Sequence, residues 1–171
     1  VKDDAYQLEQ DFKVRIDWLP LCIDLPAAHG TPETRGPREW AKVKYLYMDC
    51  RRLAAKRGLT VKGTVKIYDP TLVSIAMLYA KQHGVFRRFH DAILPRFWNR
   101  EFDIEDLAVV KKALADAGAP ADGFNAFFAG AGKAQFDEIQ ARAAQQGVFG
   151  VPTFVFRDEL FWGTDRVPML R

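Results

Sequence analysis

Apolar residues return every three or four positions along much of the chain, the spacing of helices with one buried face. The clearest case is Trp40, Val43, Tyr47, Cys50 and Ala54, which predict an amphipathic helix ending near Gly58. The same spacing, with Asp4, Asp69 and Asp103 as predicted N-caps, predicts further helices over residues 5–12, 70–84, 85–98, 104–118, 124–128 and 133–146.

Strict alternation of apolar and polar residues is confined to short stretches. Residues 14–19 alternate and predict a half-buried strand. An apolar strand is expected directly after Pro152, followed by a short turn around Arg157 and Asp158 and a second strand over 159–163. Thr164-Asp165-Arg166 then predicts a closing helix with a capping residue and an acid in its first turn.

Pro152 stands where that first C-terminal strand begins. Proline cannot donate to a sheet ladder, so it serves another purpose there. We expect a cis Val151-Pro152 peptide that turns the neighbouring backbone groups outward, where an extended peptide can pair with them. The alternative is an ordinary edge strand that opens with a trans proline.

The order of elements is helix, strand, about five helices, a crossover helix, a hairpin and a closing helix. One more strand before residue 5 would complete an α/β thioredoxin-like fold interrupted by an all-helical insertion. The predicted domains are therefore residues 1–35 with 133–171, and residues 36–132. The chain opens at Val1 without methionine, so we expect its N-terminal strand to lie upstream of the sequence.

Charge and cysteines narrow the classes of function. The net charge is +3 with a pI near 8.9, and no nucleic-acid motif or aromatic platform accompanies the basic residues, so nucleic acid is not an expected partner. No apolar run approaches the ~20 residues of a membrane span. Cys22 and Cys50 are expected to be unpaired and buried, which fits a reducing, cytoplasmic location. His29, His83 and His90 show no ligand spacing, so no metal site is expected.

Two stretches carry a family resemblance. GVFGVPTF (147–154) and ELFWGTDR (159–166) closely resemble the C-terminal signature of the 2-hydroxychromene-2-carboxylate isomerase and kappa-class glutathione transferase group, within the DsbA-like thioredoxin superfamily. The resemblance implies a glutathione-dependent isomerase or transferase with an aromatic or hydrophobic second substrate. A homodimer is one assembly that we expect of it.

The resemblance also implies a glutathione site. Backbone groups of Val151, before Pro152, would pair with the cysteinyl unit, while Thr164 and Asp165 would hold the γ-glutamyl end. Plain helix capping is the alternative for that pair. Arg166 would be a local ion-pair partner or a carboxylate ligand.

Two further segments match the family pattern in the predicted helical insertion. Lys44 would reach the glycyl carboxylate of glutathione, and the alternative is a solvated lysine on a helix; the family's asparagine just upstream has no match. Phe97 and Trp98 would line the second substrate's pocket, or belong to a core. We expect Lys44 to face the same cleft as Pro152 and Thr164.

The reactive residue of this superfamily precedes the first helix of the thioredoxin core, and we expect it upstream of Val1. It is a serine in the isomerase and transferase group and a CxxC in the disulfide oxidoreductases. A DsbA-like thiol-disulfide oxidoreductase and a non-catalytic binding protein with the same fold therefore remain the alternatives.

Overall fold

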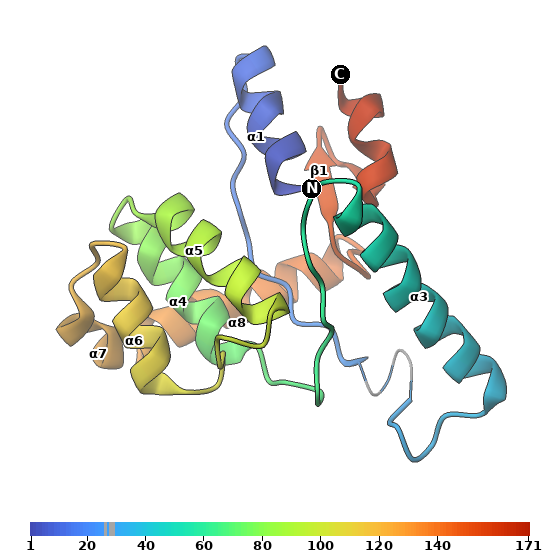
Figure 1. Ribbon diagram of the computed structural model, residues 1–171. Helices are drawn as coiled ribbons and strands as arrows, with labels where there is room; N and C mark the ends of the chain where they lie inside the picture. Colours follow the sequence, from blue (N-terminus) through green and yellow to red (C-terminus); the bar gives the residue numbers. More distant parts are fainter. Residues whose placement is uncertain (26, 28–29) are drawn as a thin grey trace. The chain divides into compact units, whose positions relative to one another are not determined.

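The computed structural model describes all residues except 26, 28 and 29 (Figure 1). It forms two compact units, Val1–Leu21 with Asp137–Arg171, and Cys22–Phe136. We call them the terminal unit and the inserted unit. The terminal unit holds α1 (Lys2–Asp11), β1 (Thr153–Phe156), β2 (Glu159–Trp162) and the 3₁₀ helix η2 (Thr164–Leu170).

The inserted unit is helical throughout its described elements. These are α3 (Pro37–Ala55), α4 (Thr71–Gln82), α5 (Phe86–Trp98), α6 (Leu107–Asp116), the 3₁₀ turn η1 (Ala121–Gly123) and α7 (Phe124–Ala129). Helix α8 (Ala131–Gln145) contains the boundary between the two units. No helix among the described residues is long and apolar enough to cross a membrane.

Helix α4 is the centre of the inserted unit's core. It packs against α5, α6 and α7 (Figure 1). The side chains buried most completely come from these four helices: Ile75, Leu78, Phe89, Val110, Leu114 and Phe124. The apolar spacing predicted from the sequence for 70–84, 85–98 and 124–128 is therefore confirmed as the basis of this core.

The C-terminal hairpin forms as predicted. β1 and β2 are antiparallel, with Thr153 opposite Trp162 and Phe156 opposite Glu159. Arg157 and Asp158 have φ angles of 50° and 67°. Positive φ at both central residues is the geometry of a two-residue type I′ turn, whose twist matches that of the strands.

The predicted strand over residues 14–19 is wrong. This segment forms no regular secondary structure, and it pairs with neither of the two strands in the described chain. Its polar groups find local partners instead: the Ile16 N–H donates to Glu9 Oε1 at 2.8 Å. The Trp18 ring packs edge-on against Tyr6 at 5.5 Å. Alternation predicts an extended backbone, but a strand also requires a neighbour with which to share a ladder.

The predicted N-caps are displaced in the structure. Asp106, not Asp103, caps α6, accepting from the N–H groups of Ala108 at 2.7 Å and Val109 at 3.1 Å. The N-cap of α4 is Pro70, although Asp69 Oδ1 still accepts from Thr71 N at 2.9 Å.

The predicted caps of the first and last helices of the terminal unit, Asp4 and Thr164, are wrong as well. Asp4 lies inside α1, whose N-cap is Val1. The closing helix is a 3₁₀ helix whose N-cap is Gly163, so Thr164 does not cap it.

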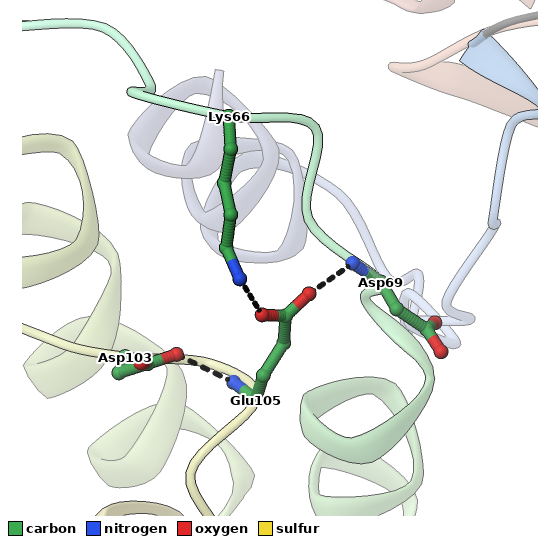
Figure 2. A network of polar contacts seen from close by, with 4 residues as sticks. All are labelled: Lys66, Asp69, Asp103 and Glu105. Carbon is green, nitrogen blue, oxygen red and sulfur yellow. Dashed lines mark hydrogen bonds and ion pairs between the residues drawn. The ribbon is translucent and has the colours of Figure 1, made fainter.

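The contacts of Glu105 explain why the N-cap of α6 is Asp106 and not the predicted Asp103. Its carboxylate accepts from Lys66 Nζ and, at 2.7 Å, from the backbone N–H of Asp69, while the Glu105 N–H donates to Asp103 Oδ1 at 2.9 Å (Figure 2). One side chain thereby ties the segment before α4 to the segment before α6. These bonds hold residues 103–105 outside the helix and leave Asp106 to cap it.

This network is expected to make the stability of the protein depend on pH. The hydrogen bond from Lys66 and the Asp69 N–H lower the pKa of Glu105 below its ordinary value. A lowered folded-state pKa contributes stability above the unfolded value, about 4.3, and loses it as the pH falls through the folded one. Denaturation of Glu105→Gln should therefore show a stability deficit at pH 7 that narrows below about pH 4. Glu101→Gln, an exposed change nearby, is the control and should show no such deficit; an equal, pH-independent loss in both variants would contradict the assignment.

Candidate functional site

The Val151-Pro152 peptide is cis, as predicted. The loop around it is tied down on both sides. The Thr153 hydroxyl donates to the Gly150 carbonyl at 2.7 Å, and the Gly163 N–H donates to the Pro152 carbonyl at 2.9 Å. Val151 itself is 58% exposed. Among the described residues no hydrogen bond engages its N–H or C=O, so both are available to an extended ligand.

The first residues of η2 follow β2 directly. Asp165 and Arg166 form an ion pair at 2.5 Å, with the side chains 71% and 48% exposed. Arg166 thus has a local ion-pair partner in the structure, and its role as a carboxylate ligand stays a prediction. Neither Thr164 nor Asp165 occupies the N-cap position, which belongs to Gly163.

The hairpin brings these two segments together. Thr153 lies opposite Trp162 in the ladder, so the loop before β1 and the turn after β2 share one end of the hairpin. The bond from the Gly163 N–H to the Pro152 carbonyl closes that end. Val151, Pro152, Thr164, Asp165 and Arg166 thus form one surface within the terminal unit, which we call the docking surface.

Lys44 belongs to the inserted unit. It lies on α3 and is exposed. With Pro37, Trp40 and Ala41 it lines a shallow groove of about 610 Å³. The Arg35 guanidinium sits over the Trp40 ring, 5.1 Å from its centre, so this groove combines an aromatic face with positive charge. The expected meeting of Lys44 with Pro152 and Thr164 stays a prediction.

Phe97 and Trp98 end α5 as a half-buried aromatic pair. Their ring centres are 5.2 Å apart, and Tyr68 packs edge-on against Phe97 at 5.6 Å. The Trp98 carbonyl accepts from Lys62 N at 3.0 Å. The rings therefore have packing partners of their own, and their role as a substrate pocket remains a prediction.

The cysteines are unpaired, as predicted, but the prediction that both are buried is wrong. Cys50 is exposed on α3, and no residue of that helix is buried. Cys22 is half-buried with its sulfur 3.8 Å from the Ser74 hydroxyl. Burial raises the pKa of the Cys22 thiol, and the hydrogen bond with Ser74 offsets this only in part.

Metal-ligand clusters are absent from the described part of the chain. His29 lies outside the described residues, so the prediction for that histidine stays as it was. The His83 ring packs edge-on against Tyr79, with ring centres 4.4 Å apart. His90 is 7% exposed, and its ring stacks on the ring of Phe86.

Sequence reasoning missed two aromatic residues beside the docking surface. The rings of Phe149 and Trp162 are 4.9 Å apart, and both residues are more than half exposed. Each stands inside one of the two family-like stretches, directly beside Gly150 or Gly163. A bulky ring next to a glycine in both stretches was the available signal.

Residues 2–171 match the DSBA-like thioredoxin domain. The chain therefore belongs to the DSBA-like thioredoxin family, and its helix-rich structure with a small two-stranded sheet is an instance of that fold.

Proteins named as isomerases are among those similar to this chain. The chain is 32% identical over 161 residues to 2-hydroxychromene-2-carboxylate isomerase of Sphingobium xenophagum, covering 91% of this chain and 80% of the relative. It is 29% identical over 171 residues to the enzyme of the same name from Pseudomonas putida, covering 96% and 81%. A solved structure of selenomethionine-labelled 2-hydroxychromene-2-carboxylate isomerase matches with a TM-score of 0.69 and 25% identity, over 97% of this chain and 82% of that one. The resemblance stated from the two C-terminal stretches is confirmed.

Proposed function

We propose that this protein is a glutathione-dependent isomerase whose second substrate is an aromatic carboxylate of the 2-hydroxychromene-2-carboxylate class. The observation that carries the proposal is the docking surface, where an exposed, unbonded Val151 backbone lies at the same hairpin end as Thr164 and Asp165. The similarity to isomerases over nearly the whole chain supports an enzymatic role and this reaction class.

The docking surface fits the groups that glutathione would offer. An extended tripeptide needs one backbone donor and one acceptor for its central residue, and Val151 has both. The γ-glutamyl end carries an ammonium and a carboxylate on one carbon. Asp165 and Arg166 hold opposite charges side by side, and both are exposed enough to exchange their mutual bond for bonds to these groups.

Lys44 would supply the third anchor, because an exposed ammonium can pair with the glycyl carboxylate. Phe97 and Trp98 would offer apolar surface to the aromatic substrate. Bound glutathione would supply a thiol nucleophile, and the residues of this chain would orient it and hold its charged ends. We also propose a cytoplasmic location and a homodimer, in line with the expectations stated from the sequence.

The direct test is whether the full-length protein isomerises 2-hydroxychromene-2-carboxylate. The change in absorbance of the substrate is measured with and without glutathione. We expect turnover that requires glutathione and is not replaced by a simple thiol at the same concentration. Glutathione-independent turnover would remove the cofactor from the proposal. Disulfide exchange on a model dithiol substrate without isomerisation would favour the oxidoreductase alternative.

Lys44→Gln tests the third anchor. Loss of one charge-assisted contact at an exposed site should weaken glutathione binding by about 1.5 kcal/mol, roughly tenfold, in calorimetry. Stability should not change, because the side chain is exposed. Lys42→Gln, an exposed lysine two positions away on the same helix, should leave affinity unchanged. Equal affinity in both variants would return Lys44 to the solvated alternative.

A further inference from the structure

Trp162 approaches the backbone of Gly150 more closely than any side chain at position 150 would allow. A Cβ atom at Gly150 would lie 2.6 Å from the Trp162 indole nitrogen and 3.3–3.4 Å from two ring carbons. The φ angle of Gly150 is outside the left-handed region, since it is not among the positive-φ glycines. A larger residue at 150 would therefore force the Trp162 ring to shift, and the backbone conformation of Gly150 imposes no such demand.

The indole ring is fixed from two other directions. Its backbone pairs with Thr153 in the hairpin ladder, and the Phe149 ring packs against it at 4.9 Å with an interplanar angle of 57°. The Gly150 carbonyl, in turn, accepts from the Thr153 hydroxyl at 2.7 Å. Gly150 is thus held between Thr153 and Trp162, immediately before the Val151 backbone.

We propose that Trp162, braced by Phe149, is a positioning residue: it presses on Gly150 and thereby sets the orientation of the Val151 N–H and C=O. This inference deepens the proposed function and rests on it, because the purpose of the arrangement is a pre-set docking backbone. Trp162 remains 52% exposed although its ring contacts both Phe149 and Gly150. Phe149 and Gly150 directly precede Val151 in the chain, where pre-ordering saves the entropy that a mobile loop would lose on binding.

The experiment is a double-mutant cycle in the full-length protein: Gly150→Ala, Trp162→Leu, and both together. Glutathione affinity is measured by calorimetry. We expect Gly150→Ala to weaken binding about tenfold, because the new methyl group and the indole ring cannot share the space. In the Trp162→Leu background the same change should have little further effect, since the smaller side chain leaves room for the methyl group. Additive losses would overturn the inference, and so would Gly150→Ala binding as tightly as the unchanged protein.

A second readout separates positioning from a general loss of structure. The ¹⁵N order parameter of the Val151 amide should be near the rigid value of about 0.85 in the unchanged protein and fall clearly in Trp162→Leu. Trp162→Phe should restore much of it, because the ring contact with Phe149 survives. Phe156→Leu, an equally exposed aromatic at the far end of the hairpin, is the control and should leave the Val151 order parameter unchanged.

These readouts also keep the two proposals distinguishable. If the unchanged protein fails to bind glutathione, the proposed function fails, and the order parameter alone decides the role of Trp162. If glutathione binds but Trp162→Leu alters neither affinity nor the Val151 order parameter, the positioning role is wrong while the proposed function stands.

Discussion

Replacing Phe124 with alanine is expected to lower the free energy of unfolding by about 3–5 kcal/mol, the range for removing a fully buried aromatic ring. Phe124 is 0% exposed, at the first position of α7. Its ring packs at 5.5 Å from Tyr79 and 6.0 Å from Phe128, where α4 and α7 meet. The cavity would open inside the core of the inserted unit, where Phe124 is completely buried.

Urea denaturation followed by circular dichroism measures this loss. Phe128→Ala is the matched control, since the same atoms are removed from a half-buried position on the same helix. It should cost clearly less. Similar losses in the two variants would mean that the core collapses around either vacancy, and that burial does not rank these two rings.

Asp165→Asn is expected to weaken glutathione binding by about 1.5–3 kcal/mol, or roughly 10- to 150-fold, the value of a hydrogen bond to a charged group. The carboxylate is 71% exposed, so solvent screening places the effect toward the lower end. The ion pair with Arg166 would be lost as well, but an exposed pair contributes little to folding. Thermal stability should therefore change much less than affinity.

Asp158→Asn is the control for that substitution. Asp158 lies in the hairpin turn, is exposed, and has the positive φ that asparagine tolerates well. Calorimetry should show unchanged glutathione affinity for Asp158→Asn. Unchanged affinity for Asp165→Asn as well would show that Asp165 serves only Arg166.

The elements that could be predicted are those specified by local spacing. α4, α5 and α7 follow their apolar repeats, and the hairpin follows from two short apolar runs around Arg157 and Asp158. The strand prediction for residues 14–19 was wrong because an alternating pattern does not show whether a partner strand is present. Helix α3 forms where its apolar repeat predicts, yet none of its residues is buried. The repeat predicts an apolar face on the helix, but it does not predict whether another element packs against that face.

The candidate site likewise contains features that short-range patterns predict and features that depend on three-dimensional contacts. Val151, Pro152, Thr164 and Asp165 come together through a hairpin whose ladder pairs Thr153 with Trp162, so short-range reasoning sufficed. Short-range reasoning could not predict the N-cap of α6, because that position depends on the bonds of Glu105 to Lys66 and Asp69, nearly forty positions away. The contact between Trp162 and Gly150 depends on how closely a ring approaches a backbone, and no pattern of residue types encodes that distance.

The division of the terminal unit between the two ends of the chain has a consequence for the order of folding. Its halves are joined by contacts such as Arg171 to Asp11 at 2.6 Å and Gln140 to the Pro20 carbonyl at 3.0 Å, which span 160 and 120 positions. The helix contacts of the inserted unit are far more local. Closing so long a loop in an unfolded chain is entropically costly, whereas a compact inserted unit shortens it in advance. Pulse-labelled amides of α4–α7 should therefore gain protection before those of α1, and the contacts between the two ends of the chain should be among the last parts of the protein to form.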